Sequence, residues 1–157
     1  MAEEIRIDEL AGEDPEVAAL LVDLTLQEQD HYTHPRETRE EVERRLRAAP
    51  TFTGENHLLV ARDGDGHPVG VCWVVLFDPG TGLEAEIAEL YVRPEVRGGG
   101  VARRLVAEAT ALLRRRLVTF AAVWTRGDNP AALSAYRAAG FAPTEQAVLT
   151  WLPLPKG

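Results

Sequence analysis

The sequence contains little cysteine and no long hydrophobic segment. Its 157 residues include one cysteine, Cys72, which excludes an internal disulfide framework and a cysteine-rich metal site. Apolar residues surround this cysteine at positions 71–75, so we expect a buried thiol and not a nucleophile. No uncharged apolar run is long enough to span a membrane, and the acidic N-terminus has no signal-peptide pattern. We therefore expect a cytoplasmic protein that is not attached to a membrane.

Basic residues are also fewer than acidic ones, at 17 against 25, which gives a formal net charge of −8. This charge argues against non-specific nucleic-acid binding, which depends on neutralising phosphates. It favours a cationic substrate through electrostatic steering, although a need for solubility alone would also explain it. The length and the apolar content of 45% are typical of one folded domain. We find no repeat, linker or low-complexity tract, and we expect a single domain over residues 1–157.

Glycine is concentrated at one place in the chain. Residues 89–102, ELYVRPEVRGGGVA, have the pattern of a strand, a turn at Pro94, an arginine, three glycines and the start of a helix. Glycines allow backbone N–H groups to converge, and a helix start adds unpaired donors and the positive end of the helix dipole. Because Arg97 adds a permanent charge, this segment predicts a phosphate or pyrophosphate site and not an empty glycine-rich loop.

Two common phosphate-binding loops do not fit this segment. A nucleotide P-loop requires Lys and then Ser or Thr after its last glycine, whereas Gly100 is followed by Val101 and Ala102. The dinucleotide-binding fingerprint requires a small residue at the position of Arg103. The loop therefore indicates another class of phosphate ligand.

Hydrophobic periodicity predicts a fold of the α/β (α+β) class, with elements in the order β-α-α-β-β-β-α-β-α-β. The apolar run 69–77 predicts a central strand that is buried on both faces. The expected strands cover residues 5–10, 57–62, 69–77, 84–93, 119–125 and 147–152. The expected helices begin after Asp14, at Arg36 (to about Ala48), after Gly100 and after Asn129.

Two sequence blocks resemble the GNAT superfamily of acyl-CoA-dependent N-acetyltransferases. Residues 97–102, RGGGVA, match the family's R-G-x-G-x-A/G pyrophosphate loop. Asn129, Tyr136 and the pair Gly140-Phe141 match its N-x-x-A-x-x-x-Y-x-x-x-G-F block. The resemblance covers roughly residues 85–141. It implies the GNAT fold, with a mixed central sheet of about six to seven strands flanked by about four helices.

The resemblance also implies an activity, namely direct transfer of the acetyl group of acetyl-CoA to a primary amine within a ternary complex. Acetyl-CoA is the expected acyl donor, and no metal is expected. Asn129 matches a residue that contacts the pantetheine arm, although it could act only as a helix N-cap. The family's coenzyme A contacts correspond here to Leu90, Tyr91 and Val92 for pantetheine and to Arg97, Gly98, Gly99, Gly100, Val101 and Ala102 for the pyrophosphate.

The strand before the glycine loop contains two candidate general bases, Glu86 and Glu89. Side chains alternate along a regular strand, so these two carboxylates are expected on opposite faces, each among apolar neighbours. A half-buried carboxylate without a partner tends to have a raised pKa, which suits a base that deprotonates an ammonium. In the family a glutamate on this strand often has that role, and we favour Glu89 over Glu86. Either could instead pair with an arginine or face solvent.

Tyr136 matches the family's tyrosine that protonates or stabilises the departing thiolate, although it could simply pack under its helix. The polar segment with Asp30, His31, Tyr32 and His34 could bind an amine, but it makes a poor metal site without a fourth ligand. We expect a small cationic amine as acceptor. A protein N-terminus or lysine remains an alternative, as do a non-catalytic acyl-CoA-binding sensor and a nucleotide-binding domain. Homodimers are common in the family.

Overall fold

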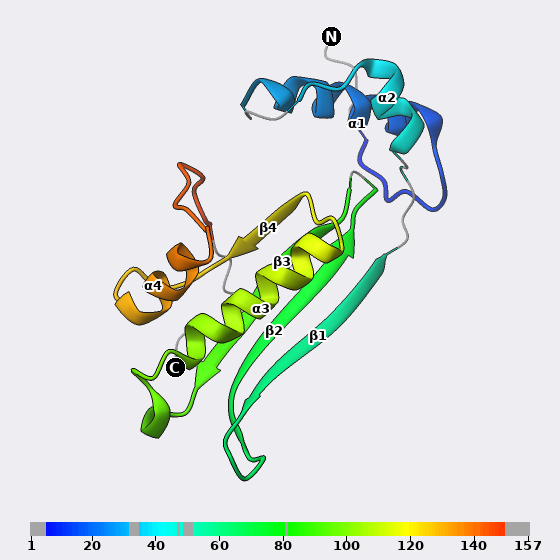
Figure 1. Ribbon diagram of the computed structural model, residues 1–157. Helices are drawn as coiled ribbons and strands as arrows, with labels where there is room; N and C mark the ends of the chain where they lie inside the picture. Colours follow the sequence, from blue (N-terminus) through cyan, green and yellow to red (C-terminus); the bar gives the residue numbers. More distant parts are fainter. Residues whose placement is uncertain (1–5, 32–34, 47, 49–51, 81, 150–157) are drawn as a thin grey trace.

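The computed structural model describes residues 6–31, 35–46, 48, 52–80 and 82–149. These residues form a four-stranded sheet, four α-helices and two short 3-10 turns (Figure 1). In chain order the elements are α1 (Pro15–Glu28), η1 (Gln29–His31), α2 (Arg39–Arg45), β1 (Thr53–Arg62), β2 (Pro68–Asp78), β3 (Glu84–Val92), η2 (Pro94–Val96), α3 (Val101–Arg115), β4 (Phe120–Val123) and α4 (Pro130–Ala138).

The sheet has the strand order β1-β2-β3-β4 and is mixed, as the sequence predicted. Strands β1, β2 and β3 pair antiparallel, and β4 runs parallel to β3. Parallel neighbours require a crossover connection, which α3 provides by lying along one face of the sheet (Figure 1). This crossover places the glycine loop at the end of β3, directly before α3.

Two of the expected strands are absent from the described residues, which contain four strands and not six to seven. Residues 6–10 and 147–149 have no regular secondary structure, and the remainder of both predicted strands lies outside the described residues. Their side chains are exposed, apart from half-buried Leu10, and 92% of Ile7 and 91% of Leu149 are accessible to solvent. Alternation predicted strands here, but a strand also needs a neighbour that satisfies its backbone hydrogen bonds and covers its apolar face.

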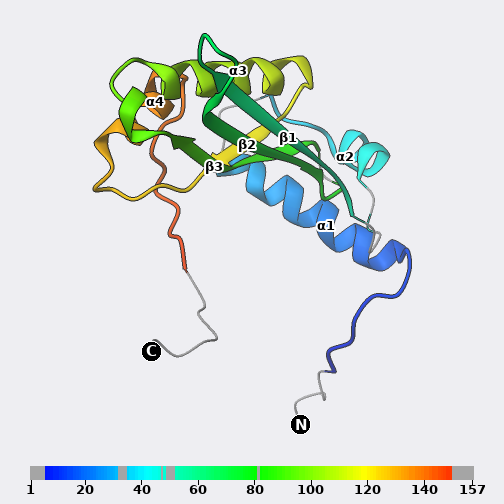
Figure 2. The same cartoon turned by 90° about the horizontal axis from the view of Figure 1, so that it is seen from below.

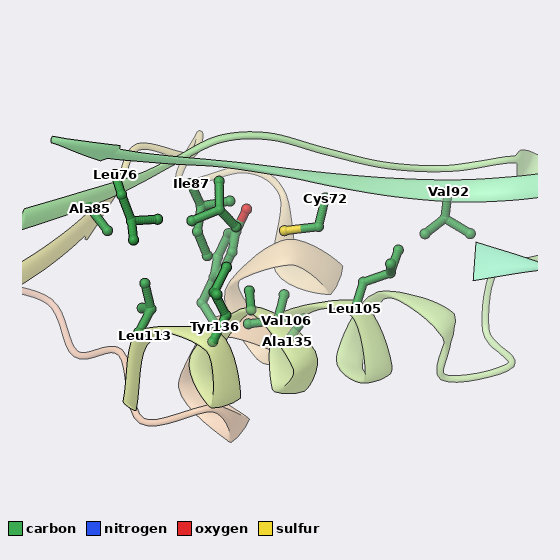
Figure 3. Packing of buried hydrophobic residues seen from close by; sticks show 13 residues of the cluster. Cys72, Leu76, Ala85, Ile87, Val92, Leu105, Val106, Leu113, Ala135 and Tyr136 are labelled. Atoms are coloured by element: carbon green, nitrogen blue, oxygen red, sulfur yellow. The ribbon is translucent and has the colours of Figure 1, made fainter. Parts of the chain in front are cut away.

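The main core lies between α3 and the sheet, with α4 closing one side (Figure 3). Cys72 lies in this core fully buried, and burial raises the pKa of its thiol to about 11. The expectation of a buried core thiol is therefore confirmed. The buried residues of this main core are Cys72, Val74, Leu76, Ala85, Ile87, Val92, Leu105, Val106, Ala109, Leu112, Leu113, Ala135 and Tyr136.

Strand β2 is buried fully on one face only, which corrects the expectation of burial on both. Side chains alternate along it, and Cys72, Val74 and Leu76 point into the main core. The opposite face is partly open, and Trp73 on that face is 39% exposed. We call this surface the open face of the sheet, because α3 and α4 do not cover it.

Helices α1 and α2 pack against each other around a small separate cluster of Val22, Val42 and Leu46. In Figure 2, α3 lies above the sheet and α1 lies below it. Asp14 caps α1 by accepting hydrogen bonds from the backbone N–H groups of Glu16 and Val17, as its sequence position predicted. Helix α2 is shorter than expected. None of the helices described is both long enough and apolar enough to cross a membrane.

Helix α3 ends in a Schellman motif whose left-handed position is occupied by Leu117. Its φ is 56°, and its side chain is 81% exposed. Left-handed backbone costs leucine about 1–2 kcal/mol, more than the roughly 0.5–1 kcal/mol that glycine loses in chain entropy. Leu117→Gly is therefore expected to raise the free energy of unfolding by roughly 0.5 kcal/mol, measured by urea denaturation.

The matched control for that substitution is Gly140→Ala at the end of α4. Gly140 occupies the equivalent left-handed position with a φ of 98°, so adding a Cβ there should lower stability by about 1 kcal/mol. A Leu117→Gly variant that is less stable than the parent would contradict the prediction.

Candidate active site

The glycine loop has the backbone conformation of an anion cradle. Gly98 and Gly100 have φ angles of 84° and 81°, in the left-handed region where only glycine fits without strain. Gly100 is the N-cap of α3, and its carbonyl accepts the first helical hydrogen bond, from the N–H of Arg104. The N–H groups of Val101 and Ala102 belong to the first turn and need an acceptor from outside the helix. The first turn of α3 contains no acidic residue that would compete for an anion.

Arg97 connects this loop to the end of β3. Its Nε donates a hydrogen bond to the carbonyl oxygen of Val92 at 2.9 Å, and its guanidinium carbon lies 5.8 Å from the centre of the Tyr91 ring. The side chain is exposed, and no carboxylate among the described residues forms an ion pair with it. The loop therefore presents a positive charge beside its glycines.

A β-bulge interrupts β3 at Ala88. Trp73 of β2 pairs with Glu89, but the next residue of β2 pairs with Ile87, so Ala88 has no partner across the strands. Beyond this extra residue, every side chain points to the face opposite the one that regular alternation predicts. Glu86 and Glu89 therefore both project from the open face of the sheet. The expectation that they lie on opposite faces is wrong, because it assumed an unbroken strand.

The bulge also marks the point where the sheet opens. Strand β4 pairs only with residues 84–87 of β3, whereas β3 continues to Val92. Within the described part of the chain, the edge of β3 from Ala88 to Val92 has no strand on the side of β4. An extended ligand could pair with such an edge through strand-like hydrogen bonds. We call this unpaired stretch of the β3 edge the β3–β4 gap.

The two carboxylates differ in their surroundings. Glu86 is half-buried beside β4, and Glu89 is exposed. Neither forms an ion pair within the residues that the structure describes. Trp73 lies directly across from Glu89, and its indole Nε1 donates to Asn56 Oδ1 at 2.8 Å. Sequence reasoning missed this tryptophan, although strict alternation along β2 would have placed it on the open face.

Tyr136 approaches the gap from the other face of the sheet. It is 6% exposed, its ring packs edge-on against Phe141 at 5.8 Å, and its hydroxyl points toward the sheet near Ile87 and Cys72 (Figure 3). Burial, with smaller contributions from Cys72 and Glu89, raises the pKa of Tyr136 to about 12. This pKa keeps the hydroxyl protonated near neutral pH. No described residue hydrogen-bonds to it, so it can donate to a ligand.

Asn129 and the residues around it set the position of α4. Its Oδ1 accepts a hydrogen bond from the N–H of Ala132 at 3.2 Å, so the expected N-cap is confirmed. The side-chain NH₂ group of Asn129 has no hydrogen-bond partner among the residues between 6 and 149 that the structure describes, so its donors are available to a ligand. A role in pantetheine binding remains a prediction.

The polar segment after α1 contributes little to the described site. Asp30 forms an ion pair with Arg36 on the surface. The side chain of His31 lies outside the described part, and so do Tyr32 and His34 entirely. Their predicted contact with an amine therefore stays a prediction.

Comparison with known proteins identifies the family of this fold and loop. A model of the acetyltransferase (GNAT) family matches residues 20–141. Mycothiol acetyltransferase of Tsukamurella paurometabola is 35% identical over 86 residues, which make up 55% of this chain and 29% of that protein. The enzyme of the same name from Beutenbergia cavernae is 35% identical over 100 residues, or 63% of this chain and 33% of that protein. The chain thus spans about a third of the length of these curated relatives.

Solved structures agree on the fold. An aminoglycoside acetyltransferase from an uncultured soil metagenomic sample, in complex with sisomicin, superposes with a TM-score of 0.53 at 16% identity, covering 87% of this chain and 89% of that one. An integron cassette protein from the Cole Harbour salt marsh metagenome gives 0.53 at 18% identity, covering 90% and 88%. The GNAT fold expected from two sequence blocks is therefore confirmed. Since the family model covers most of the sequence, the chain belongs to the acetyltransferase (GNAT) family.

Proposed function

We propose that the protein transfers the acetyl group of acetyl-CoA directly to a primary amine, without a covalent enzyme intermediate. The observation that carries this proposal is the β3–β4 gap between the bulge at Ala88 and the glycine loop. Two carboxylates lie on one face of the sheet at this gap, and a buried phenol approaches from the other face. A thioester placed in the gap would be within reach of an amine from one face and an acid from the other.

The acyl donor has a continuous binding path in this proposal. The pantetheine arm pairs with the free edge of β3 at Leu90, Tyr91 and Val92, and the side-chain NH₂ group of Asn129 donates to it. The pyrophosphate binds the N–H groups of residues 98–102, where positive φ angles and the start of α3 turn the donors outward. Arg97 neutralises part of its charge. Holding the donor at three points supplies the positioning that accounts for most of the rate gain in such a transfer.

The chemistry needs a base, an oxyanion donor and a group that stabilises the leaving thiolate. Glu89 accepts the proton of the ammonium, directly or through a water, because only the neutral amine is nucleophilic. A backbone N–H on the free edge of β3 polarises the thioester carbonyl. Tyr136 donates its hydrogen bond to the thiolate as the carbon–sulfur bond breaks, and the phenolic proton can pass to sulfur.

The acceptor in this proposal is a small cationic amine. Glu86 and Glu89 place two negative charges on the open face, and Trp73 adds an aromatic surface to which a cation is attracted. The net charge of −8 steers cations toward the protein. The curated relatives are named for mycothiol, but they share only part of their length with this chain, so the acceptor is best found by an amine screen.

The test is a calorimetric titration with acetyl-CoA, with ATP and NADH as control ligands. Selective binding of acetyl-CoA, followed by amine-dependent thiol release, supports the proposal. Binding of acetyl-CoA without thiol release for any amine, peptide N-terminus or lysine peptide would instead indicate a sensor domain. Selective binding of ATP would contradict the proposal.

Gly100→Ala is expected to weaken acetyl-CoA binding roughly tenfold, because strain of about 1 kcal/mol moves the N–H donors and a methyl group enters the cradle. The matched control is Gly64→Ala, in the β1–β2 turn, where a Cβ meets nothing within 4 Å and φ is not positive. Titration of both variants with acetyl-CoA measures the difference. Equal affinities in the two variants would place the pyrophosphate elsewhere.

A further inference from the structure

A glycine occupies position 70 of strand β2, under the first turns of α3. Gly70 pairs with Ala61 of β1 and with Val92, the last residue of β3, so it lies inside the sheet and not at its edge. It is buried, and its φ is not positive, so its backbone conformation is open to any residue. Glycine in the interior of a strand weakens the strand and often marks a place where another part of the chain approaches closely.

Helix α3 makes the close approach at Gly70. A Cβ added to Gly70 would lie 3.1 Å from Leu105 Cδ1 and 3.3 Å from Val101 Cγ1. It would also lie 3.2 Å from the backbone oxygen of Tyr91. Carbon atoms pack best at a separation of about 3.5–4.0 Å, so an added methyl group would be compressed from three sides. The absence of a side chain at position 70 therefore lets α3 lie directly against the backbone of the sheet.

The residues around Gly70 belong to the parts of the chain that shape the glycine loop. Val101 follows Gly100 and provides an N–H of the first turn of α3. Leu105 is buried one turn later and points from α3 toward the sheet near Val92 (Figure 3). The carbonyl of Val92, which pairs with Gly70, accepts the hydrogen bond from Arg97 Nε. The start of α3 and the anchor of Arg97 thus meet above and beside one glycine.

We propose that Gly70 is a positioning residue for the pyrophosphate of acetyl-CoA, which acts through α3 and does not touch the ligand. A side chain at position 70 lifts the first turn of α3, and the N–H groups of Val101 and Ala102 move with it. Strand β3 stays paired with β2, so the pyrophosphate donors move relative to the strand edge that holds the pantetheine arm. Hydrogen bonds and the placement of the donor are both sensitive to such a displacement. The proposal rests on the function proposed above, since it takes the pyrophosphate to lie in the glycine loop.

The experiment measures the dissociation constant of acetyl-CoA by calorimetry for Gly70→Ala and Gly70→Val. We expect the constant to rise about tenfold for alanine and further for valine, because overpacking grows with the added volume, while the stoichiometry stays that of the parent. Both residues suit a strand better than glycine does, so a weaker strand cannot explain the loss. An unchanged dissociation constant would overturn the inference, even with a lower stoichiometry, because Gly70 would then affect folding only.

Gly54→Ala is the matched control, since Gly54 lies in β1 of the same sheet and away from α3. Its added Cβ would meet the ring of Phe52, which is exposed and can turn away, and the backbone oxygen of Leu76 at 3.3 Å. This variant should bind acetyl-CoA as the parent does. Equal losses of affinity in Gly54→Ala and Gly70→Ala would overturn the inference.

Leu105→Val tests the contact itself, because it removes the Cδ1 atom that the new methyl group would meet. Combined with Gly70→Ala it conserves the packed volume, so the dissociation constant should return to within about threefold of the parent value. A loss of affinity that Leu105→Val does not relieve would overturn the inference. Failure of the parent to bind acetyl-CoA would overturn the proposed function itself, so the two failures are distinguishable.

Discussion

Replacing Tyr136 with phenylalanine is expected to lower kcat about 100-fold and to leave the affinity for acetyl-CoA nearly unchanged. Phenylalanine keeps the edge-on contact with Phe141, so α4 should hold its position. What is lost is a hydroxyl that points at the sheet without a partner among the described residues, and is therefore available to a leaving thiolate. Steady-state kinetics together with calorimetric titration separates the two effects.

The raised pKa of the Tyr136 phenol predicts how kcat should depend on pH. Burial raises the pKa of Tyr136 to about 12, so the protonated form persists from pH 7 to pH 10. The parent enzyme should therefore show no loss of kcat over that range from ionisation of this group.

The control for this substitution is Phe141→Leu, which removes the aromatic partner of Tyr136 but keeps its hydroxyl. It should reduce kcat far less than Tyr136→Phe does. Full activity of Tyr136→Phe between pH 7 and pH 10 would remove this residue from the mechanism and leave it a packing role.

Glu89→Gln is expected to lower kcat by about 100- to 1,000-fold at pH 7, because the acceptor amine is then almost entirely protonated and no carboxylate deprotonates it. The deficit should shrink as the pH approaches 10, since bulk solvent then supplies neutral amine. Glutamine keeps the size of the side chain, so a change in pH profile cannot come from lost packing.

Glu86→Gln is the matched comparison, because the bulge at Ala88 places both carboxylates on the open face of one strand. We expect a loss of less than tenfold, mainly as a higher KM for a cationic amine. The reverse order of effects would assign the base role to Glu86. Parent-like kcat in both variants at pH 7 would show that neither glutamate is the base.

The sequence was most informative where one residue type has one structural use. Asp14 and Asn129 cap helices as expected, and the positive φ angles of Gly98 and Gly100 explain why glycines stand before α3. The bulge could not be predicted, because Ala88 is an ordinary strand residue and only the pairing with β2 reveals the extra position. Alternation of side chains along a regular strand therefore could not predict that Glu86 and Glu89 lie on the same face, even though both were identified as candidate bases.

The strands predicted near the two ends of the sequence were also not found in the described residues. Apolar alternation at residues 5–10 and 147–152 resembles that of true strands, since periodicity reports what a side chain prefers and not whether a neighbouring strand is present. Strand β1 satisfies the same local pattern but pairs with β2 over its whole length. Periodicity could not predict the surface pocket that Arg103 of α3 and residues of α4 line. That pocket forms only when the two helices pack together, and β4 separates them in the chain.

The cluster under α1 and α2 shares no residue with the main core beneath α3. Substitutions at Val22, Val42 or Leu46 can therefore accumulate without repacking the strand and helix that flank the glycine loop. The two N-terminal helices therefore form a packing unit that can change in sequence independently of the half that contains the glycine loop and the bulge.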